Sequence, residues 1–193
     1  MITSFIPKQI KYDGRQIQSL WAYKTFGIQG DSIVSFIGPC NIPFANMVDQ
    51  EDRLARSKIY SRLMLHFIVE HFDTDLDKAI LRQRLLSVIV KDVLGSAYKI
   101  RGIRRDGDDL YDPDSHHRGK LAKLSISIAT ASPVSTKIHF GINIKSKGAP
   151  VLAKGLDDYG IKSVKSFALS VMEQYCAEMA SVNKARTKVS WIK

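Results

Sequence analysis

Three aspartates lie within one short polar stretch of this 193-residue chain. The turn Asp106-Gly107-Asp108-Asp109 leads directly into Leu110 and Tyr111. Carboxylates gathered around a glycine could hold Mg²⁺, which binds one or two carboxylates together with phosphate oxygens. The alternative is an acidic surface turn without a ligand, and the residue types alone favour that alternative.

Two lysines, Lys120 and Lys123, follow this turn and precede a segment of alternating residues. A lysine at the mouth of a hairpin with a serine-rich inner face can hold the carboxylate or phosphate of a substrate. Lysines are also common on exposed strand edges, where they oppose aggregation. Both interpretations stay open for these two residues.

The segment after the lysines has the pattern of a β-hairpin. Apolar residues alternate with small or polar ones at a period of two: Leu124, Ile126 and Ile128 against Ser125, Ser127 and Ala129. Pro133 and its serine neighbours then predict a turn, and apolar residues alternate again over 138–144. The pattern therefore predicts two paired strands with carboxylates and lysines at one end.

The histidines and cysteines are weaker candidates for chemistry. Adjacent residues of an extended chain point to opposite sides, so His116 and His117 make a poor metal-binding pair. His66 and His71 are five residues apart and are expected to be ordinary core or surface residues. No sequence pattern supplies a base that could activate either cysteine as a nucleophile. Both cysteines are therefore predicted to have structural roles. The two cysteines are Cys40 and Cys176.

The remaining elements follow from spacing and turn residues. We predict a hairpin over 4–18 turned at Asp13-Gly14, and a buried strand at 33–37. Residues 17–26 fit either a helix or a strand. Apolar residues every four positions predict a helix within 44–72, and Asp75 is expected to cap a second helix that ends at Gly95. A strand at 98–103 and a helix over 163–184 capped by Ser163 complete the set.

This order of elements predicts an α+β fold in which helices back a mostly antiparallel sheet. Nothing in residues 1–193 marks a boundary, so we expect a single domain.

The composition indicates the cellular location of the protein and the kinds of partner it could bind. Few cysteines, no signal-peptide pattern and no long apolar run predict a cytoplasmic protein that does not span a membrane. The formal net charge is +10. Such a field attracts phosphates, carboxylates, RNA or acidic proteins, but no zinc-finger, RNA-binding or helix-turn-helix motif accompanies it. A solvated basic surface is the simpler interpretation.

Three short motifs resemble the catalytic core of biotin protein ligases. Asp108-Asp109-Leu110-Tyr111 resembles their Asn-Asp-Leu-Tyr motif, Lys120-Leu121-Ala122 their Lys-Leu-Ala-Gly strand, and Gly141-Ile142-Asn143 their Gly-Ile-Asn strand. Lipoate and octanoate transferases are similar, with a His-Gly-x-x-x-Asn motif comparable to 139–143. The resemblance implies the fold shared with class II aminoacyl-tRNA synthetases. Over nearly its full length the chain also resembles an uncharacterised, largely archaeal family with GDDLY, KLSxSIAT and HFGIN segments.

The resemblance implies roles for particular residues. Asp109 matches an aspartate near the nucleotide and metal, which implies ATP and Mg²⁺ as cofactors. Either Lys123 or Lys120 matches the lysine that holds the acyl or biotinyl carboxylate, and the spacing to Asn143 favours Lys123. The implied ligand-binding residues are Asp108, Asp109, Tyr111, His139 and Asn143.

Two hallmarks of these enzymes are missing. The ligases wrap the adenylate with a Gly-Arg-Gly-Arg-Arg-Gly or Arg-Arg-x-x-Gly-Gly-Gly loop, where this chain offers Gly38-Pro39-Cys40-Asn41. Octanoyl transferases attack with a cysteine after proline, where this chain has Pro150-Val151. Valine cannot act as a nucleophile.

The sequence thus predicts a ligase-like pocket for a small-molecule carboxylate or an acyl-adenylate-like molecule. If the protein is an enzyme, acyl transfer or ATP-dependent ligation is the expected reaction class. A different prediction is a non-catalytic binding module for RNA or an acidic protein, and a third is a subunit of a homo-oligomer. Salt dependence separates the first two, because binding to a phosphate backbone weakens steeply with ionic strength.

Overall fold

A five-stranded sheet with the order β1-β2-β3-β8-β7 organises the computed structural model, which describes residues 1–113 and 120–192. Adjacent strands of this sheet pair in antiparallel orientation, except for β1 and β2, which are parallel. The strands are β1 (Ile2–Ile6), β2 (Ser32–Asn41), β3 (Tyr60–His71), β7 (Ser125–Ala131) and β8 (Thr136–Lys145).

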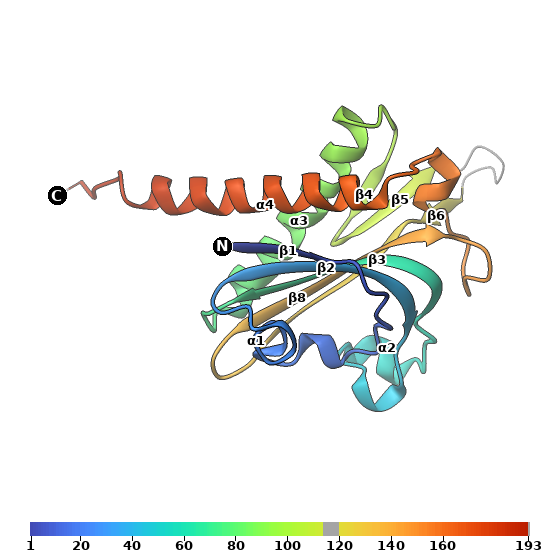
Figure 1. Cartoon of the computed structure of the whole chain (residues 1–193), viewed down its shortest axis with the longest axis horizontal. Coiled ribbons are helices and arrows are strands. Elements are labelled where there is room, and N and C mark those ends of the chain that lie inside the picture. The colour runs from blue at the N-terminus through green and yellow to red at the C-terminus, as the bar shows by residue number, and fades with distance from the viewer. Residues whose placement is uncertain (114–119, 193) are drawn as a thin grey trace.

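A smaller antiparallel sheet with the order β4-β5-β6 extends from one end of the first. It consists of β4 (Arg104–Asp106), β5 (Asp109–Pro113) and β6 (Leu121–Lys123). Two long helices, α3 (Leu76–Ser96) and α4 (Val164–Arg186), cover one face of the large sheet (Figure 1). The mixed, mostly antiparallel sheet backed by helices confirms the predicted α+β fold.

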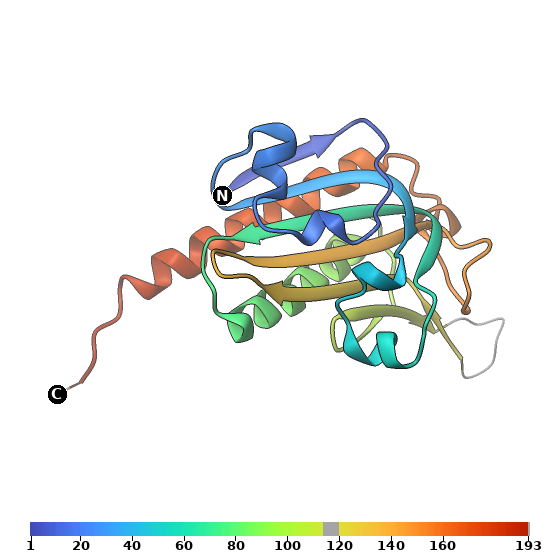
Figure 2. The ribbon, with the colours of Figure 1, turned by 90° about the horizontal axis from the view of Figure 1, so that it is seen from below.

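The opposite face of the large sheet carries only short elements, as Figures 1 and 2 show. They are η1 (Arg15–Ile17), α1 (Trp21–Phe26), η2 (Phe44–Asn46) and α2 (Gln50–Leu54). A last short turn of helix, η3 (Leu156–Tyr159), precedes α4. No helix in the described part of the chain is long and apolar enough to cross a membrane.

Side chains of β3 are buried on both faces of the sheet. Leu65, Phe67 and Val69 enter the core beneath α3 and α4, whereas Met64 and Ile68 join a second cluster on the other face. A strand buried on both faces has a nearly continuous apolar sequence rather than a simple alternation.

The predicted helix within 44–72 is therefore wrong. Leu63 and Phe67 are four residues apart, which places them on one face of a helix but equally on one face of a strand. Only Gln50–Leu54 is α-helical in this region, with Asp49 accepting hydrogen bonds from the backbone of Glu51 and Asp52.

Two other predictions also need correction. The region 4–18 is not a hairpin, because β1 pairs parallel with β2 and the chain must cross over between them. Gly14, at φ 90°, is instead the N-cap that precedes η1. Residues 98–103 contain no strand, and the strand begins at Arg104.

The predicted central hairpin and helix caps are confirmed. Strands β7 and β8 pair from Ala131 and Thr136 at the turn to Ser125 and Ile142. Asp75 accepts a hydrogen bond from the backbone of Lys78, and Ser163 accepts one from Ser166. Helix α3 ends at Ser96, one residue beyond the expected Gly95.

A buried ion pair joins the two central strands. Lys137 Nζ lies 2.9 Å from Glu70 Oε2, and their side chains are only 1% and 2% exposed. Glu70 also accepts hydrogen bonds from the Ser135 hydroxyl and the Leu20 backbone. These bonds compensate the cost of removing the carboxylate from water.

We predict that Lys137→Met destabilises the fold by about 3–5 kcal/mol, because it leaves Glu70 buried without its cation. Urea unfolding measures this loss. Lys145→Met, at the exposed end of the same strand, is the matched control and should change stability by less than about 0.5 kcal/mol. Adding Glu70→Gln to Lys137→Met should recover part of the loss. Equal stability of the two single variants would contradict the role of the pair.

Candidate functional site

A cavity of about 400 Å³ lies on the sheet face opposite α3 and α4. Strands β7 and β8 form its floor, the smaller sheet one end, and the segment 42–59 between β2 and β3 one wall. Five of the predicted site residues line it: Asp108, Asp109, Lys123, His139 and Asn143. Tyr111 and Lys120 do not line it.

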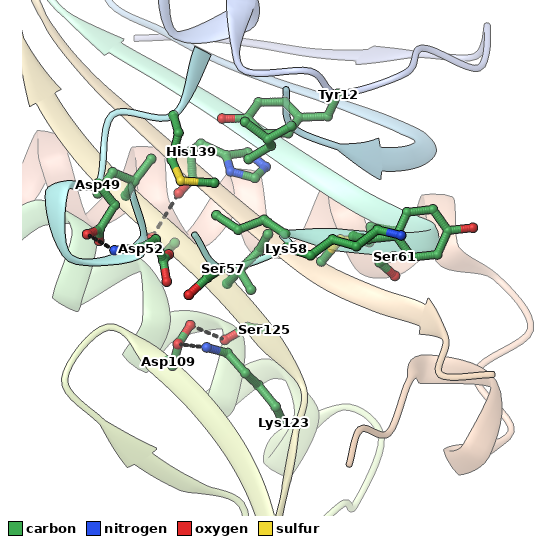
Figure 3. A pocket seen from close by; sticks show the side chains of 18 of the residues that line it. Tyr12, Asp49, Asp52, Ser57, Lys58, Ser61, Asp109, Lys123, Ser125 and His139 are labelled. Atoms are coloured by element: carbon green, nitrogen blue, oxygen red, sulfur yellow. Dashed lines mark hydrogen bonds and ion pairs between the residues drawn. The ribbon is translucent and has the colours of Figure 1, made fainter. Parts of the chain in front are cut away.

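Lys123 and Asp109 form an ion pair at one end of the cavity (Figure 3), with 2.6 Å between Lys123 Nζ and Asp109 Oδ2. The pairing of β5 with β6 sets Tyr111 opposite Lys123. Asp109, two residues before Tyr111, lies on the same side of its strand, so the lysine reaches it diagonally. Lys123 Nζ thereby passes 5.9 Å from the centre of the Tyr111 ring, which places Tyr111 beside the cavity lining.

Ser125 fixes the position of Asp109. Its hydroxyl donates to Asp109 Oδ1 over 3.3 Å and accepts from the backbone N–H of Leu110 over 2.8 Å. The Asp109 side chain is 17% exposed and that of Lys123 31%. The lysine is therefore the more accessible partner from the cavity.

Burial raises the pKa of Asp109 to about 6, against the opposing influence of Lys123 and Ser125. Burial lowers the pKa of Lys123, but the nearby Asp109 carboxylate outweighs this and leaves that pKa raised. At neutral pH both groups are charged. A fall of about one pH unit protonates half of the Asp109 population.

Asp108 lines the cavity, but residues of α3 hold it in position. Gln83 donates to Asp108 Oδ2 over 2.7 Å and to the Ser127 hydroxyl over 2.9 Å. The Ser87 hydroxyl donates to the backbone oxygen of Asp108. Helix α3 thus sets the position of the turn before Asp109.

Asn143 joins the central strands to the lysine strand. It accepts a hydrogen bond from Ser61 over 2.8 Å and donates to the backbone oxygen of Lys123 over 3.4 Å. A side chain at the neighbouring Gly141 would be crowded, since a Cβ there would lie 3.0 Å from Met64 Cε and 3.3 Å from the His139 ring. The Gly-Ile-Asn motif therefore combines close packing with support of Lys123.

Sequence reasoning missed Tyr12 and the 42–59 segment. Tyr12 stacks on the His139 ring at 3.6 Å, at the opposite end of the cavity from Lys123 (Figure 3). The segment contributes Asp49, Asp52 and Lys58 to the wall. The helix predicted within 44–72 concealed most of this segment, and no local pattern links Tyr12 to a residue 127 positions later.

The other candidates do not enter the cavity. Cys40 is buried, and burial raises the pKa of its thiol to about 12, which opposes a nucleophilic role. Burial also raises the pKa of Cys176. His71 is bonded to Asp31 and Tyr175. His116 and His117 lie outside the described residues.

Comparison with known proteins places the chain in a family. Residues 1–190 match the family described as Domain of unknown function (DUF366). The chain belongs to this family. An uncharacterized protein of Methanocaldococcus jannaschii is 42% identical over 186 residues, covering 93% of this chain and 80% of that protein. A protein of unknown function from Pyrococcus horikoshi has a solved structure at 40% identity and a TM-score of 0.90, covering 100% and 99% of the two chains.

More distant structures share the fold of this DUF366 chain. The biotin protein ligase of Aquifex aeolicus in complex with biotin and ATP superposes with a TM-score of 0.57 at 14% identity, covering 90% of this chain and 69% of that one. A bi-partite lipoate protein ligase of Thermoplasma acidophilum gives 0.55 at 12%, covering 91% and 83%. The predicted resemblance to biotin and lipoate ligases is confirmed for the fold.

ATP and Mg²⁺ require groups for phosphates and for a metal. Among residues 1–113 and 120–192, no group of three or more His, Cys, Asp or Glu side chains could hold a metal ion. Asp109 is engaged by Lys123 and Asp108 by Gln83. Four aspartates and only two lysines line the cavity, so bare phosphates would be repelled. These residues do not by themselves form an ATP–Mg²⁺ site, and metal binding by Asp109 stays a prediction.

We predict that Asp109 makes the stability of the fold depend on pH in an unusual direction. Its folded pKa of about 6 exceeds its ordinary 3.8, so the folded state holds the proton more tightly. This contribution is fully present below about pH 4 and is lost as the pH rises through about 6.

Urea unfolding of wild type and Asp109→Asn at pH 4.0 and 7.5 tests this prediction. Relative to the variant, which cannot titrate at this position, wild type should lose on the order of 2–3 kcal/mol between the two pH values. A stability difference that stays constant with pH would contradict the raised pKa.

Proposed function

We propose that the cavity binds a small-molecule carboxylate, or the acyl group of an acyl-adenylate-like molecule, through Lys123. The observation that supports this proposal is the Lys123–Asp109 pair in the cavity wall. Lys123 Nζ already binds one carboxylate at 2.6 Å, and an ammonium group carries three N–H donors. Its partial exposure lets a ligand carboxylate reach these donors in competition with Asp109.

The shape and lining of the cavity fit such a ligand. Its volume of about 400 Å³ lies within the range of small-molecule sites. Apolar side chains also line the cavity: Ile42, Ile59, Met64, Ile126 and Ile128. A ligand with a carboxylate head and an aliphatic chain would match both parts.

The structural relatives support the same class of ligand. Biotin, bound in the Aquifex ligase complex, and lipoate, after which the Thermoplasma ligase is named, are carboxylic acids with an aliphatic chain. A sequence identity of 12–14% supports a shared fold but not a shared activity. Acyl transfer or ATP-dependent ligation is accordingly the reaction class to test once a ligand is found.

We predict that Lys123→Met abolishes binding of this ligand, because it removes the cation that the carboxylate contacts. Thermal unfolding with biotin, lipoate or octanoate provides the measurement. A ligand at 100 times its Kd adds roughly 2.7 kcal/mol to the free energy of unfolding. The matched control is Lys120→Met, three residues earlier and exposed, which should retain the shift. Equal shifts in both variants would refute the assignment to Lys123.

We also predict that carboxylate binding tightens as the pH falls. Asp109 competes with the ligand only while it is ionised, and its pKa is about 6. Its protonated fraction rises from a few per cent at pH 7.5 to about three quarters at pH 5.5, so the affinity should rise on the order of tenfold. Calorimetric titration at both pH values measures the change. Asp109→Asn should bind tightly at both, and a wild-type affinity independent of pH would argue against competition by Asp109.

A second candidate function uses the outer surface of the protein. The chain has a net charge of +10, although aspartates predominate in the cavity. Lys184, Arg186 and Lys188 are exposed at the end of α4, which projects beyond the sheet (Figure 1). Binding of RNA or an acidic protein there would weaken steeply with salt and would be unaffected by Lys123→Met.

A further inference from the structure

A chain of buried hydrogen bonds leads from β2 to the cavity through two histidines. His66 Nε2 lies 3.1 Å from the backbone oxygen of Gly38, and His66 Nδ1 lies 3.0 Å from His139 Nε2. His66 is inaccessible to solvent and His139 is 1% exposed. Tyr12 stacks on the His139 ring at 3.6 Å with 13° between the planes. The rings are thus held in fixed orientations.

The order of these bonds determines where each proton lies. A backbone oxygen only accepts, so His66 Nε2 must carry the hydrogen that it donates to Gly38. Burial lowers the pKa of His66 to about 4 and holds that of His139 well below its ordinary value, so both rings are neutral at pH 7. His66 Nδ1 is then an acceptor, and His139 Nε2 must donate to it. His139 Nδ1 is left without a hydrogen.

The hydrogen bonds described above leave His139 Nδ1 unused. Within residues 1–113 and 120–192, no group hydrogen-bonds to this nitrogen. In that part of the chain the fully buried side-chain nitrogen and oxygen atoms without a partner are the hydroxyls of Ser32 and Ser35. Nδ1 is not among them and so keeps a small accessible surface, although His139 as a whole is 1% exposed. His139 lines the cavity, and Figure 3 shows it beside Tyr12 and away from Lys123.

The strand register sets the separation between the two polar ends. Ser125, which binds Asp109, pairs with Ile142, whereas Ile128 pairs with His139. Three residues along β7 span about 10 Å, the length of an extended chain of about eight carbon atoms. Ile126 and Ile128 line the interval.

We infer that His139 Nδ1 is a specificity-determining acceptor, which selects a carboxylic acid with an N–H or O–H donor at its far end. This inference rests on the proposed function, since Lys123 holds the carboxylate. The acid has a medium-length aliphatic chain that lies along the isoleucines. His66 does not touch the ligand and is a positioning residue that fixes the tautomer of His139. A ligand with only an acceptor at the far end would face the nitrogen lone pair and leave it unsatisfied.

A matched pair of acids tests this inference on the wild-type protein. The far end of 8-hydroxyoctanoate can donate a hydrogen bond, whereas that of 8-methoxyoctanoate can only accept one. Calorimetric titration should give at least about tenfold tighter binding of the hydroxy acid. Biotin, whose ring carries N–H groups, should likewise bind more tightly than lipoate, whose ring has none. Equal binding of the hydroxy and methoxy acids would overturn the inference.

Two variants of His66 test whether this residue controls the preference for the hydroxy acid. A purely structural role of His66 would not change that preference. His66→Asn places an amide oxygen near the former Nδ1, where it can still accept from His139, and should retain the preference for the hydroxy acid. His66→Leu removes the acceptor and frees the tautomer, so the two acids should bind within about twofold of each other. Retention of a tenfold preference in His66→Leu would contradict the role of His66.

Nitrogen NMR of the free protein tests the tautomer without a ligand. The His139 signals should show a proton on Nε2 and none on Nδ1, and a proton on Nδ1 would overturn the inference whatever binds. If both acids bind equally and Lys123→Met abolishes their binding, the proposed function stands and the inference fails. If neither acid nor octanoate binds, the proposed function and the inference that rests on it both fail.

Discussion

The buried polar groups shared by β3 and β8 impose the constraint on which the rest of the structure depends. Three side-chain links cross between these strands on one face of the sheet: Ser61–Asn143, His66–His139 and Glu70–Lys137. Polar groups out of water are costly unless they are bonded, so each link needs its partner across the strands. The other face of the same strands is apolar and packs against α3 and α4. The apolar face thereby packs against the helices, while the polar face carries side chains that line the cavity.

This division explains the location of the cavity. A sheet face with polar side chains cannot be sealed by a long apolar helix, and only short helices and connecting segments cover it. The 42–59 segment forms a wall without filling the space, while Gly141 keeps the floor low between His139 and Asn143. The smaller sheet then brings Lys123 and Asp109 to one end. Recognition groups at both ends are thus held by strands, which position side chains more rigidly than loops do.

Local patterns predicted the elements whose signals are local. The β7–β8 hairpin follows from period-two alternation and a turn, and Asp75 and Ser163 identify helix starts. The same reasoning failed for β3, because a strand buried on both faces shows no alternation and its four-residue spacing imitates a helix. It also failed at Asp13-Gly14, since pairing of β1 with β2 is set by a crossover rather than by a turn. Lys123 and Asp109 were identified from motif order, but their contact depends on the pairing of β5 with β6. Tyr12 reaches His139 only through tertiary packing, which no short motif encodes.

The Lys123–Asp109 pair has a property that a lone lysine in the same place would lack. An unpaired lysine that is two-thirds buried would bind its own proton less tightly until a ligand carboxylate took the place of the aspartate. Asp109 prevents this by keeping the pKa of Lys123 raised. Burial raises the pKa of Asp109 to about 6, and Lys123 opposes that rise. The aspartate therefore preserves the cation while binding its own proton weakly enough to stay ionised at pH 7. Such a pair can exchange an internal carboxylate for an external one with little rearrangement of the strands that carry it.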